Sequence, residues 1–375
     1  MKRLLITLTA VLLCTAVFAQ KDVPYVLTPV ADNPSTPTRY QGSTGTCWCH
    51  AGISFLESEL IRRGKGTYDL SEMFLVYHNY LNRYFGNHML HGKGNLSQGG
   101  HPHQVMRLVA WYGVVPESIY HGKMYDGDRH DHKAMNARIK EMGAAVAEAR
   151  AYTAGDRAAL TSLLDSRLGP LPETFTWEGK EYTPKSFAEH LGLNAKYLDE
   201  IVNFTSFSHY PFYRPFSLEV KDNWDGGQYM NVPLDEFEAI IDYALRHGYT
   251  VIWSGDTNAG FDRSHEMAIN PLPECFDEAM KFRKIYPEIE VTQENRQYDF
   301  ETFRTLDQHS MHITGLYKDQ NGNYFYKVKE SAFRPGSDNG GFMYMSRSFI
   351  TMRGLSIMVH RKGVPREIRK KCGIK

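Results

Sequence analysis

The sequence predicts an α+β fold with two lobes, a helical N-terminal lobe and a C-terminal lobe built on an antiparallel sheet. Apolar residues recur at helical spacing through the first half of the chain. Short runs rich in β-branched and aromatic residues fill the last third. The chain has 375 residues, of which 42% are hydrophobic and 13% aromatic, and this is enough for a large core.

The first residues have the pattern of a signal peptide. Lys2 and Arg3 precede a mostly apolar run from Leu4 to Phe18, and Ala19 supplies a small residue for cleavage. Residues 1–19 are therefore predicted to be a signal peptide, and the mature protein is expected to be exported and either periplasmic or secreted. No later segment is long and apolar enough to insert in a membrane, and no basic run suggests binding to nucleic acid.

The most informative helix pattern begins at Cys47. Small residues dominate the preceding segment 42–46, and Ala51 and Phe55 follow on one face at helical spacing. Thr46 is predicted to cap the helix through its hydroxyl. The start of a helix favours a thiolate, because the backbone dipole stabilises the anion. By itself, a cysteine that opens a core helix is more often buried and inert.

The rest of the helical lobe follows in order. Ser71 to Tyr84 has apolar and aromatic residues at helical spacing and is predicted to pack beside the first helix. Residues 87–103 are rich in glycine and histidine and are predicted to form a loop that lines a cleft. Gln104 to Tyr112 predicts a further helix that ends at Gly113.

The region of about 125–245 is predicted to be an inserted, mostly helical subdomain. Helical composition is found over Lys133–Ala151, Arg157–Leu168, Ser186–Leu191 and Asp235–His247. Phe175 to Tyr182 interrupts these helices and is predicted to form a loop or a hairpin.

The C-terminal third predicts a series of short strands. They are expected over Thr250–Trp253, His312–Tyr317, Tyr324–Glu330, Phe342–Met345 and Ser356–His360. The dipeptide Asn321-Gly322 lies between two of them and is a strong hairpin signal.

Four sequence blocks, taken together, indicate a family. Gln41 lies six residues before Cys47, which is followed by Trp48, and this spacing resembles the active-site segment of papain-like cysteine peptidases. Asp69-Leu70-Ser71-Glu72, Gln98-Gly99-Gly100 and Gly113-Val114-Val115-Pro116 resemble the later blocks of that family, in the same order. With its long middle region the chain is similar to the bleomycin hydrolase or aminopeptidase C branch, over nearly all of its length after residue 20.

The resemblance implies a two-lobed papain-like peptidase domain over 20–375, with a cleft between the lobes. It implies that Cys47 is the nucleophile, that the Gln41 amide faces the oxyanion, and that Gly99 and Gly100 line the substrate. Peptides are the expected substrates, and no cofactor is expected. Hexamers are known in this branch, so a homo-oligomer is expected here.

The general base is predicted to be His309. The segment Asp307–Gly315 contains two histidines, and His309-Ser310-Met311 fits the family pattern of a histidine followed by a small and an apolar residue. His312 is the alternative base. An offset of three along a strand places the two side chains on opposite faces, so the two histidines are not expected to face the same cleft.

At the third position of the triad the chain departs from the family. Relatives have Asn-Ser-Trp-Gly, whereas this chain has Glu330-Ser331-Ala332-Phe333. Alternation along the strand places Glu330 with Val328, toward the interior. A carboxylate can orient a histidine ring as an amide oxygen does, and it favours the imidazolium. Two outcomes are open: a working Cys-His-Glu triad, or a catalytically impaired protein that binds peptides.

Two further questions concern the histidines and the C-terminal segment. His88, His91, His101, His103, His121, His130 and His132 prompt a metalloprotein hypothesis. No pair has the His-Glu-x-x-His spacing, so no metal site is predicted. In the resembled branch a C-terminal tail blocks one end of the cleft and makes the enzyme an aminopeptidase. The segment after Val364-Pro365-Arg366 is short here, so aminopeptidase action is expected but strict exopeptidase action is left open.

Overall fold

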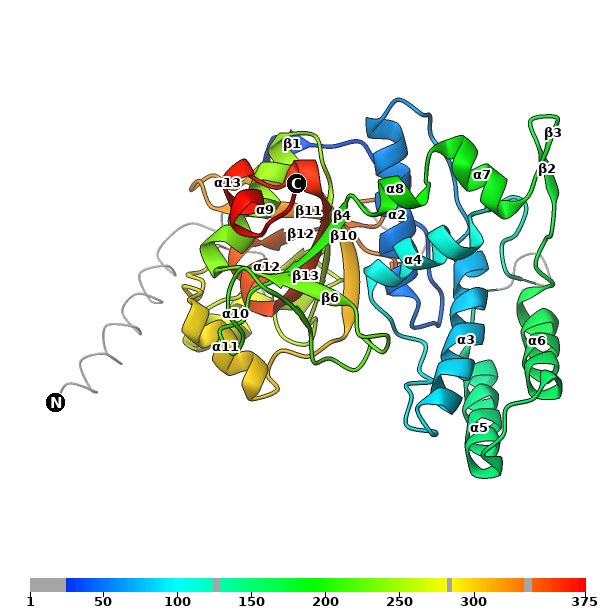
Figure 1. The fold of residues 1–375 in the computed structure, drawn as a ribbon. Helices are drawn as coiled ribbons and strands as arrows, with labels where there is room; N and C mark the ends of the chain where they lie inside the picture. The colour runs from blue at the N-terminus through cyan, green and yellow to red at the C-terminus, as the bar shows by residue number, and fades with distance from the viewer. Residues whose placement is uncertain (1–24, 124–128, 282–284, 334–338) are drawn as a thin grey trace.

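The computed structural model describes residues 25–123, 129–281, 285–333 and 339–375 (Figure 1). The predicted signal peptide lies outside these residues. Two lobes lie side by side, one built from helices and one around a large sheet, as the sequence predicts. Two main hydrophobic clusters of buried residues correspond to the two lobes.

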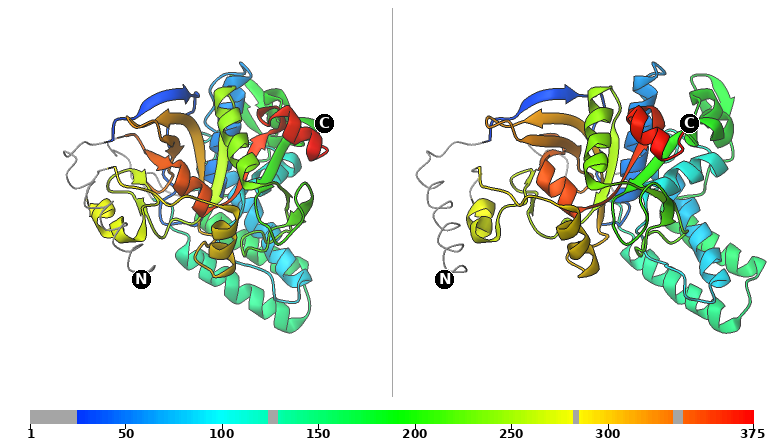
Figure 2. Two further views of the ribbon diagram at one scale, coloured as in Figure 1. Left: turned by 90° about the vertical axis from the view of Figure 1, so that its left-hand side faces the viewer. Right: turned by 60° about the vertical axis from the view of Figure 1, so that its left-hand side comes forward.

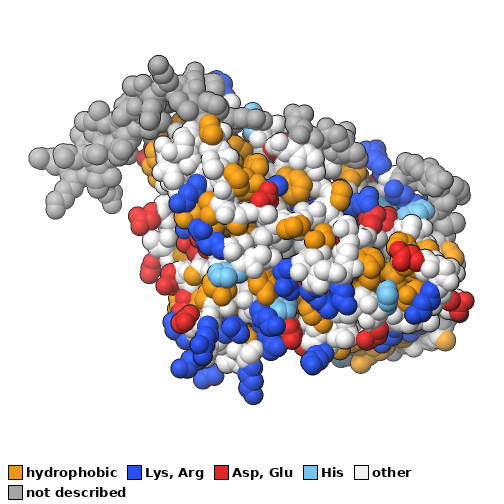
Figure 3. Space-filling view, turned by 90° about the horizontal axis from the view of Figure 1, so that it is seen from above, with side chains coloured by type: hydrophobic (Ala, Val, Ile, Leu, Met, Phe, Trp, Pro, Cys, Tyr) orange, Lys and Arg blue, Asp and Glu red, His pale blue; other side chains and the backbone are white. Residues whose placement is uncertain are grey.

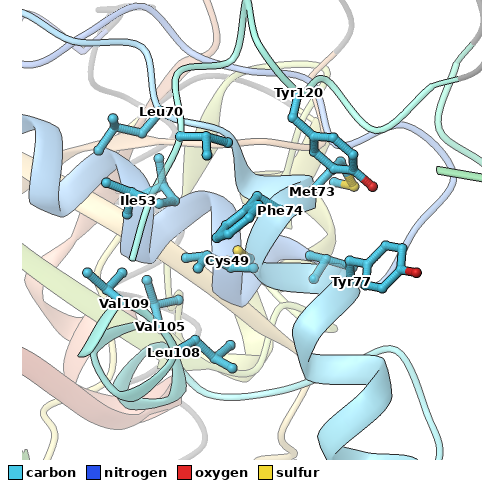
Figure 4. Packing of buried hydrophobic residues seen from close by; sticks show 14 of the residues in the cluster. Cys49, Ile53, Leu70, Met73, Phe74, Tyr77, Val105, Leu108, Val109 and Tyr120 are labelled. Atoms are coloured by element: carbon cyan, nitrogen blue, oxygen red, sulfur yellow. The ribbon is translucent and has the colours of Figure 1, made fainter. Parts of the chain in front are cut away.

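The helical lobe contains α2 to α8. Their bounds are α2 (Cys47–Arg62), α3 (Glu72–Met89), α4 (Pro102–Tyr112), α5 (Lys133–Ala149), α6 (Ala154–Leu168), α7 (Pro184–Leu191) and α8 (Ala195–Leu198). Between α6 and α7, β2 (Phe175–Trp177) and β3 (Lys180–Tyr182) form the hairpin expected there. Figure 4 shows side chains of α2, α3 and α4 meeting in the core of this lobe, Cys49 and Phe74 among them.

Local signals fix the ends of these helices. Ser71 caps α3, and its side chain accepts a hydrogen bond from the backbone N–H of Phe74 at 3.1 Å. Thr153 forms a capping box with Asp156 at the start of α6. Gly113 ends α4 with a φ of 84°, in the region that favours glycine. The predicted helix start at Ser71 and the predicted end at Gly113 are therefore confirmed, whereas α6 begins at Ala154, three residues before the predicted start at Arg157.

The other lobe is built on one sheet of eleven strands. Their order is β5-β6-β4-β13-β7-β10-β11-β12-β9-β8, and β1 (Thr28–Asp32) pairs with β10. The central strands are β7 (Val251–Gly255), β10 (His309–Lys318), β11 (Tyr324–Lys329), β12 (Phe342–Ser346) and β13 (Gly354–His360). The others are β4 (Ile201–Thr205), β5 (Pro215–Ser217), β6 (Gln228–Asn231), β8 (Phe261–Asp262) and β9 (Met267–Ala268).

A tight turn joins β10 to β11 where the sequence predicts a hairpin. The Asp319 carboxylate accepts hydrogen bonds from the backbone N–H groups of Asn321 and Asn323 at 2.9 and 2.8 Å. Gly322 has a φ of 89°, which a residue with a side chain rarely adopts. The resulting register pairs His312 with Lys329.

Helices cover the sheet lobe. They are α9 (Leu234–Arg246), α10 (Phe276–Lys281), α11 (Gln293–Glu301), α12 (Arg347–Arg353) and α13 (Arg366–Lys371), with short 3-10 turns at Pro273–Cys275 and Arg361–Gly363. α9 packs on β1, β7 and β10, and its Phe237 and Ile241 enter the core of this lobe. Within the described chain no helix combines the length and hydropathy of a bilayer span.

The prediction of one helical subdomain over 125–245 is wrong in its second half. The helices up to Leu198 join the helical lobe, but residues 201–231 contribute β4, β5 and β6 to the sheet, and α9 also packs on that sheet. The strands escaped detection because each is at most five residues long, too short for a period to stand out.

Helix α2 lies at the boundary of the two lobes, as the views in Figures 1 and 2 agree. It packs on α3 and α4 on one side and on β7 and β10 on the other. Ile252 and Met358, from strands β7 and β13, join the hydrophobic core of the helical lobe. Fourteen of its sixteen residues are buried, so its N-terminus is held rigidly against the sheet.

On the face in Figure 3, basic and acidic side chains are interspersed with hydrophobic and neutral ones.

Candidate active site

Cys47 is the first residue of α2, and its exposed fraction is 8%. The predicted cap by the Thr46 hydroxyl is wrong, because Thr46 has φ −103° and ψ 17° instead of the extended backbone that a capping side chain needs. Its hydroxyl lies 2.6 Å from the Thr44 hydroxyl. The Thr46 carbonyl starts the helix, accepting hydrogen bonds from the N–H groups of Cys49 and His50 at 2.9 and 3.2 Å.

The two neighbouring cysteines have different environments. Cys47 and Cys49 are both free thiols. Cys49 is completely buried, and its Sγ donates a hydrogen bond to the Glu72 carbonyl at 3.4 Å. Burial raises the pKa of Cys49 well above its usual value, so this thiol stays protonated. Of these two sulfurs, only that of Cys47 contacts a histidine.

That histidine is His309, the candidate base, which is the first residue of β10. Its ring hydrogen-bonds the Cys47 side chain. The ring Nε2 lies 2.7 Å from Oε1 of Glu330, which leaves Nδ1 for the contact with the sulfur. Cys47, His309 and Glu330 therefore form a continuous line, although 262 positions separate Cys47 from His309 in the chain.

Electrostatic interactions along this line favour the charged forms of His309 and Glu330. Burial alone would lower the pKa of His309, but the Glu330 carboxylate and Cys47 raise it to about 10. Burial alone would raise the pKa of Glu330, but the positive His309 ring and hydrogen bonds hold it below its usual value. The contacts thus favour the charged form of the His309 ring beside the Glu330 carboxylate at neutral pH.

Glu330 is held from two further directions. Its Oε1 accepts a hydrogen bond from the Ala332 N–H at 2.8 Å, and its Oε2 lies 3.4 Å from Nη2 of Arg263. The Glu330 side chain is 0% exposed, which confirms the inward direction predicted from strand alternation. No sequence pattern indicates Arg263, because it lies in the turn after β8 and 67 residues before its partner.

Gln41 lies beside this line, and its side-chain amide already makes two hydrogen bonds. Its Nε2 donates a hydrogen bond to the Thr44 carbonyl at 2.6 Å, and its Oε1 accepts one from the Ser331 hydroxyl at 2.7 Å. An amide nitrogen carries two N–H groups, so one remains for a further acceptor. Because Ser331 follows Glu330 directly, the same segment positions both Gln41 and the triad carboxylate.

The glycine pair adjoins the start of α2. Trp48 Nε1 donates to the Gln98 carbonyl at 3.1 Å, and the Gln98 side chain accepts from the Gly45 N–H at 2.9 Å. A β-carbon on Gly100 would lie 3.0 Å from the Trp48 ring, so packing requires glycine there. The Gly99 carbonyl accepts a hydrogen bond from Arg83, so this backbone group is not open to a substrate.

Arg83 is a supporting residue that the sequence analysis missed. It is 2% exposed and donates to the Asn95 carbonyl at 2.8 Å and to the Ser97 hydroxyl at 3.1 Å, as well as to Gly99. One guanidinium therefore shapes the whole segment that runs past Trp48. Its place on α3 looked like an ordinary polar position in an amphipathic helix, so no local signal distinguished it.

Replacement of Arg83 by methionine is expected to lower the free energy of unfolding by about 3 kcal/mol, because three hydrogen bonds from a buried charged donor are lost. KM for peptide substrates is expected to rise, because the segment of Gly99 loses its support. Urea unfolding and steady-state kinetics measure both. The control is Arg138→Met, which removes an exposed pair with Glu141 and is expected to change stability by less than about 0.5 kcal/mol. Equal effects of the two variants would contradict the assigned role.

The alternative base, His312, lies elsewhere. Its Nδ1 is 2.9 Å from the Ser54 hydroxyl, two turns along α2 from Cys47, and its side chain is fully buried. Met311 and Ile313 point into the core of the sheet lobe, on the opposite face of β10. His312 therefore packs between the sheet and α2, and His309 is the histidine at the candidate site.

The other histidines make separate contacts. His101 pairs with Asp307 at 3.1 Å, and His103 pairs with Asp225 at 2.9 Å. Across the part of the chain that the structure describes, no group of three or more His, Cys, Asp or Glu side chains could hold a metal ion.

Comparisons with known proteins agree with this geometry. The model of the Peptidase C1-like family matches residues 20–373. Aminopeptidase C of Lactobacillus delbrueckii subsp. lactis is 24% identical over 195 residues, covering 44% of this chain and 42% of that protein. Aminopeptidase G of the same organism is 24% identical over 295 residues, covering 70% and 63%. The chain thus spans less than two thirds of the length of these two relatives.

Longer alignments support the same relationship. Bleomycin hydrolase of Rattus norvegicus is 21% identical over 395 residues, covering 92% of this chain and 84% of that protein. The crystal structure of PepW from Lactobacillus rhamnosis has the same fold, with a TM-score of 0.70 at 16% identity over 92% of this chain and 84% of that one. Because the family model covers nearly the whole sequence, the chain belongs to the Peptidase C1-like family.

Proposed function

We propose that this protein is a cysteine peptidase with aminopeptidase action on peptides. The observation that carries the proposal is the line from Cys47 through His309 to Glu330, in which the nucleophile contacts a base that a buried carboxylate orients. The arrangement meets the requirement of nucleophilic catalysis for a positioned and activated thiol. The relatives named aminopeptidase C and aminopeptidase G support the choice of peptide N-termini as substrates.

In the proposed reaction, the Cys47 thiolate attacks the carbonyl carbon of the scissile peptide bond. The free N–H of Gln41 and the backbone N–H of Cys47 stabilise the oxyanion that forms. The His309 imidazolium then gives its proton to the leaving amine, the C–N bond breaks and an acyl-enzyme remains. Water, deprotonated by His309, hydrolyses the thioester and releases the free thiol.

A second candidate is a protein that binds peptides without cleaving them. It is favoured by the replacement of the family asparagine by Glu330 and by the engagement of the Gln41 amide with Thr44. Turnover of aminoacyl fluorogenic amides separates the two candidates. A thiol-directed epoxide at neutral pH provides an independent measurement, because it labels an activated Cys47 but not the protonated Cys49. An enzyme shows turnover and labelling at Cys47; the second candidate shows neither.

We further propose that the mature protein is exported after cleavage near Ala19, and that it assembles as a homo-oligomer. The apolar run after Lys2 and Arg3 supports the first proposal. N-terminal sequencing of the mature protein tests it, and light scattering measures the assembly. A mature protein that begins at Met1, or a monomer at micromolar concentration, would contradict the respective proposal.

A further inference from the structure

A loop of the sheet lobe contacts the glycine segment beside the candidate site. Residues 218–227 join β5 to β6, and a β-carbon built on Gly99 would overlap the Asp222 carboxylate of this loop. A β-carbon built on the next residue, Gly100, would point into the helical lobe, toward Trp48 and Gln104. Asp222 therefore covers the side of Gly99 that faces the sheet lobe.

Two sets of contacts place Asp222 close to the triad. On one side, its backbone N–H donates to Oδ2 of Asp307 at 3.2 Å, and Asp307 lies two residues before His309. On the other side, Gly99 is adjacent to Gln98, which holds Gly45, two residues before Cys47. The Asp222 carboxylate thus lies where the lobes meet, between the segment that precedes Cys47 and the segment that precedes His309.

One oxygen of this carboxylate is free to bind a cation. Oδ1 accepts hydrogen bonds from Asn95 Nδ2 at 2.9 Å and Ser97 Oγ at 3.1 Å. Oδ2 has no hydrogen-bond partner among the described residues, and Asp222 is partly exposed. The neighbouring Arg83 donates its hydrogen bond to the Gly99 carbonyl and interacts with Asp222 through charge alone. A partly desolvated carboxylate with a free oxygen attracts a positively charged hydrogen-bond donor.

The nearby acidic side chains are already paired. Asp307 contacts His101 at 3.1 Å, while Asp225 contacts His103 at 2.9 Å and also pairs with Arg107. These contacts occupy both carboxylates, so neither competes with Asp222 for a bound cation.

The described C-terminal residues lie on another part of the sheet lobe. The Lys371 ammonium pairs with Glu236 on α9, and the Lys375 carbonyl accepts from Arg361 at 2.8 Å. Figure 1 shows this end beside α13 and α9. Residues 371–375 therefore lie away from Gly99, and the Asp222 carboxylate faces this segment.

We propose that Asp222 binds the α-ammonium group of the substrate and so directs cleavage to free peptide N-termini. This inference rests on the proposed peptidase function. A peptide that extends from Cys47 along Gly99 meets the Asp222 side chain. This side chain blocks a peptide that continues beyond Gly99, and its carboxylate stabilises a positive charge at the peptide's amino terminus. Peptides with a protonated amino terminus are thus the substrate class, and acylated or internal peptide segments are excluded.

The test uses two substrates that differ only at the amino terminus, alanyl-7-amido-4-methylcoumarin and its N-acetyl derivative. The wild-type enzyme is expected to favour the free substrate by about 10²-fold in kcat/KM, the range of a charge-assisted hydrogen bond. Asp222→Asn is expected to lower kcat/KM for the free substrate about 10- to 100-fold, mainly through KM. It is expected to leave the acetylated substrate within about twofold.

A matched control lies in the same loop. Glu219 is exposed and pairs with His209 at 3.3 Å, so Glu219→Gln is expected to leave both rates unchanged. If Asp222→Asn does not fold, the propionyl substrate, which lacks only the amine, tests the wild-type enzyme directly and is expected to be as poor as the acetylated one.

The possible failures are distinguishable. Equal hydrolysis of free and acetylated substrates by the wild type, or an unchanged preference in folded Asp222→Asn, overturns the role of Asp222 and leaves the peptidase function standing. If the wild type hydrolyses neither substrate and the epoxide does not label Cys47, the proposed function fails and this inference fails with it.

Discussion

The Cys47→Ala variant is expected to lose about 10⁴- to 10⁶-fold in the turnover of aminoacyl fluorogenic amides, the range found when a nucleophile is removed from a catalytic triad. The physical reason is that Cys47 supplies the sulfur that contacts the His309 ring, and no other group takes its place in the line. Steady-state kinetics measure the loss. Circular dichroism is expected to show an unchanged fold, because the substitution removes a single atom at the edge of the core.

Cys49 provides the control for this prediction. It lies two residues further along the same helix, is completely buried and is held protonated by burial. Cys49→Ala is expected to cost about 1–2 kcal/mol of stability, for a small cavity between α2 and α3, and to leave kcat/KM within about threefold. Substantial activity in Cys47→Ala, or its loss in folded Cys49→Ala, would contradict the assignment of the nucleophile.

The Glu330→Gln variant is expected to lower kcat/KM at neutral pH by about 10²-fold. Glutamine keeps the shape and an oxygen that can accept from the His309 ring, but it removes the charge that helps to raise the pKa of His309 to about 10. Each unit by which this pKa falls removes about 1.4 kcal/mol of imidazolium stability. The basic limb of the pH–rate profile is therefore expected to move to lower pH, toward the usual histidine range.

The dependence of stability on pH gives a second readout. Glu330 has a lowered native pKa, so its contribution is present above its unfolded value of about 4.5 and is lost as the pH falls through the native value. His309 has a raised native pKa, so its contribution is present below about 6.5 and is lost as the pH rises through about 10. The pair therefore stabilises the fold most between these unfolded values, and Glu330→Gln is expected to flatten this maximum in thermal melts.

Glu288→Gln is the matched control, because Glu288 is another buried glutamate of the sheet lobe, bonded to Ser346 and the Asn270 N–H. It is expected to leave the pH–rate profile unchanged. Unchanged turnover and an unchanged basic limb in Glu330→Gln would eliminate the idea of a charged orienting residue. The site would then depend on the shape of the side chain alone.

Local signals made much of the fold and part of the site predictable. The helical period after Cys47, the Ser71 cap and the Asn321-Gly322 turn act over a few residues, so a single sequence reveals them. Alternation over one strand was enough to direct Glu330 inward. In contrast, β4, β5 and β6 have too few residues for a period, and their place in the sheet depends on partners such as β13, more than a hundred residues away.

The side chains that complete the site were not predictable for the same reason. Arg83, Asp222 and Arg263 carry no local pattern, because each acts through a contact that the fold creates between distant segments. The predicted Thr46 cap failed for a local reason, because the Thr46 backbone is not extended and its hydroxyl bonds to Thr44, two residues earlier.

The sequence by itself therefore determined the two lobes, the helix that begins at Cys47 and the candidates Gln41, His309 and Glu330, because period, spacing and family order are properties of neighbouring residues. Only the tertiary structure decided that His309 and not His312 reaches the sulfur, that Arg263 holds Glu330, and that Asp222 faces Gly99. The contacts of His309 and Asp222 cross the boundary of the lobes, whereas Arg263 and Glu330 meet within the sheet lobe. Each contact joins segments that lie far apart in the chain, so no local stretch of sequence specifies it.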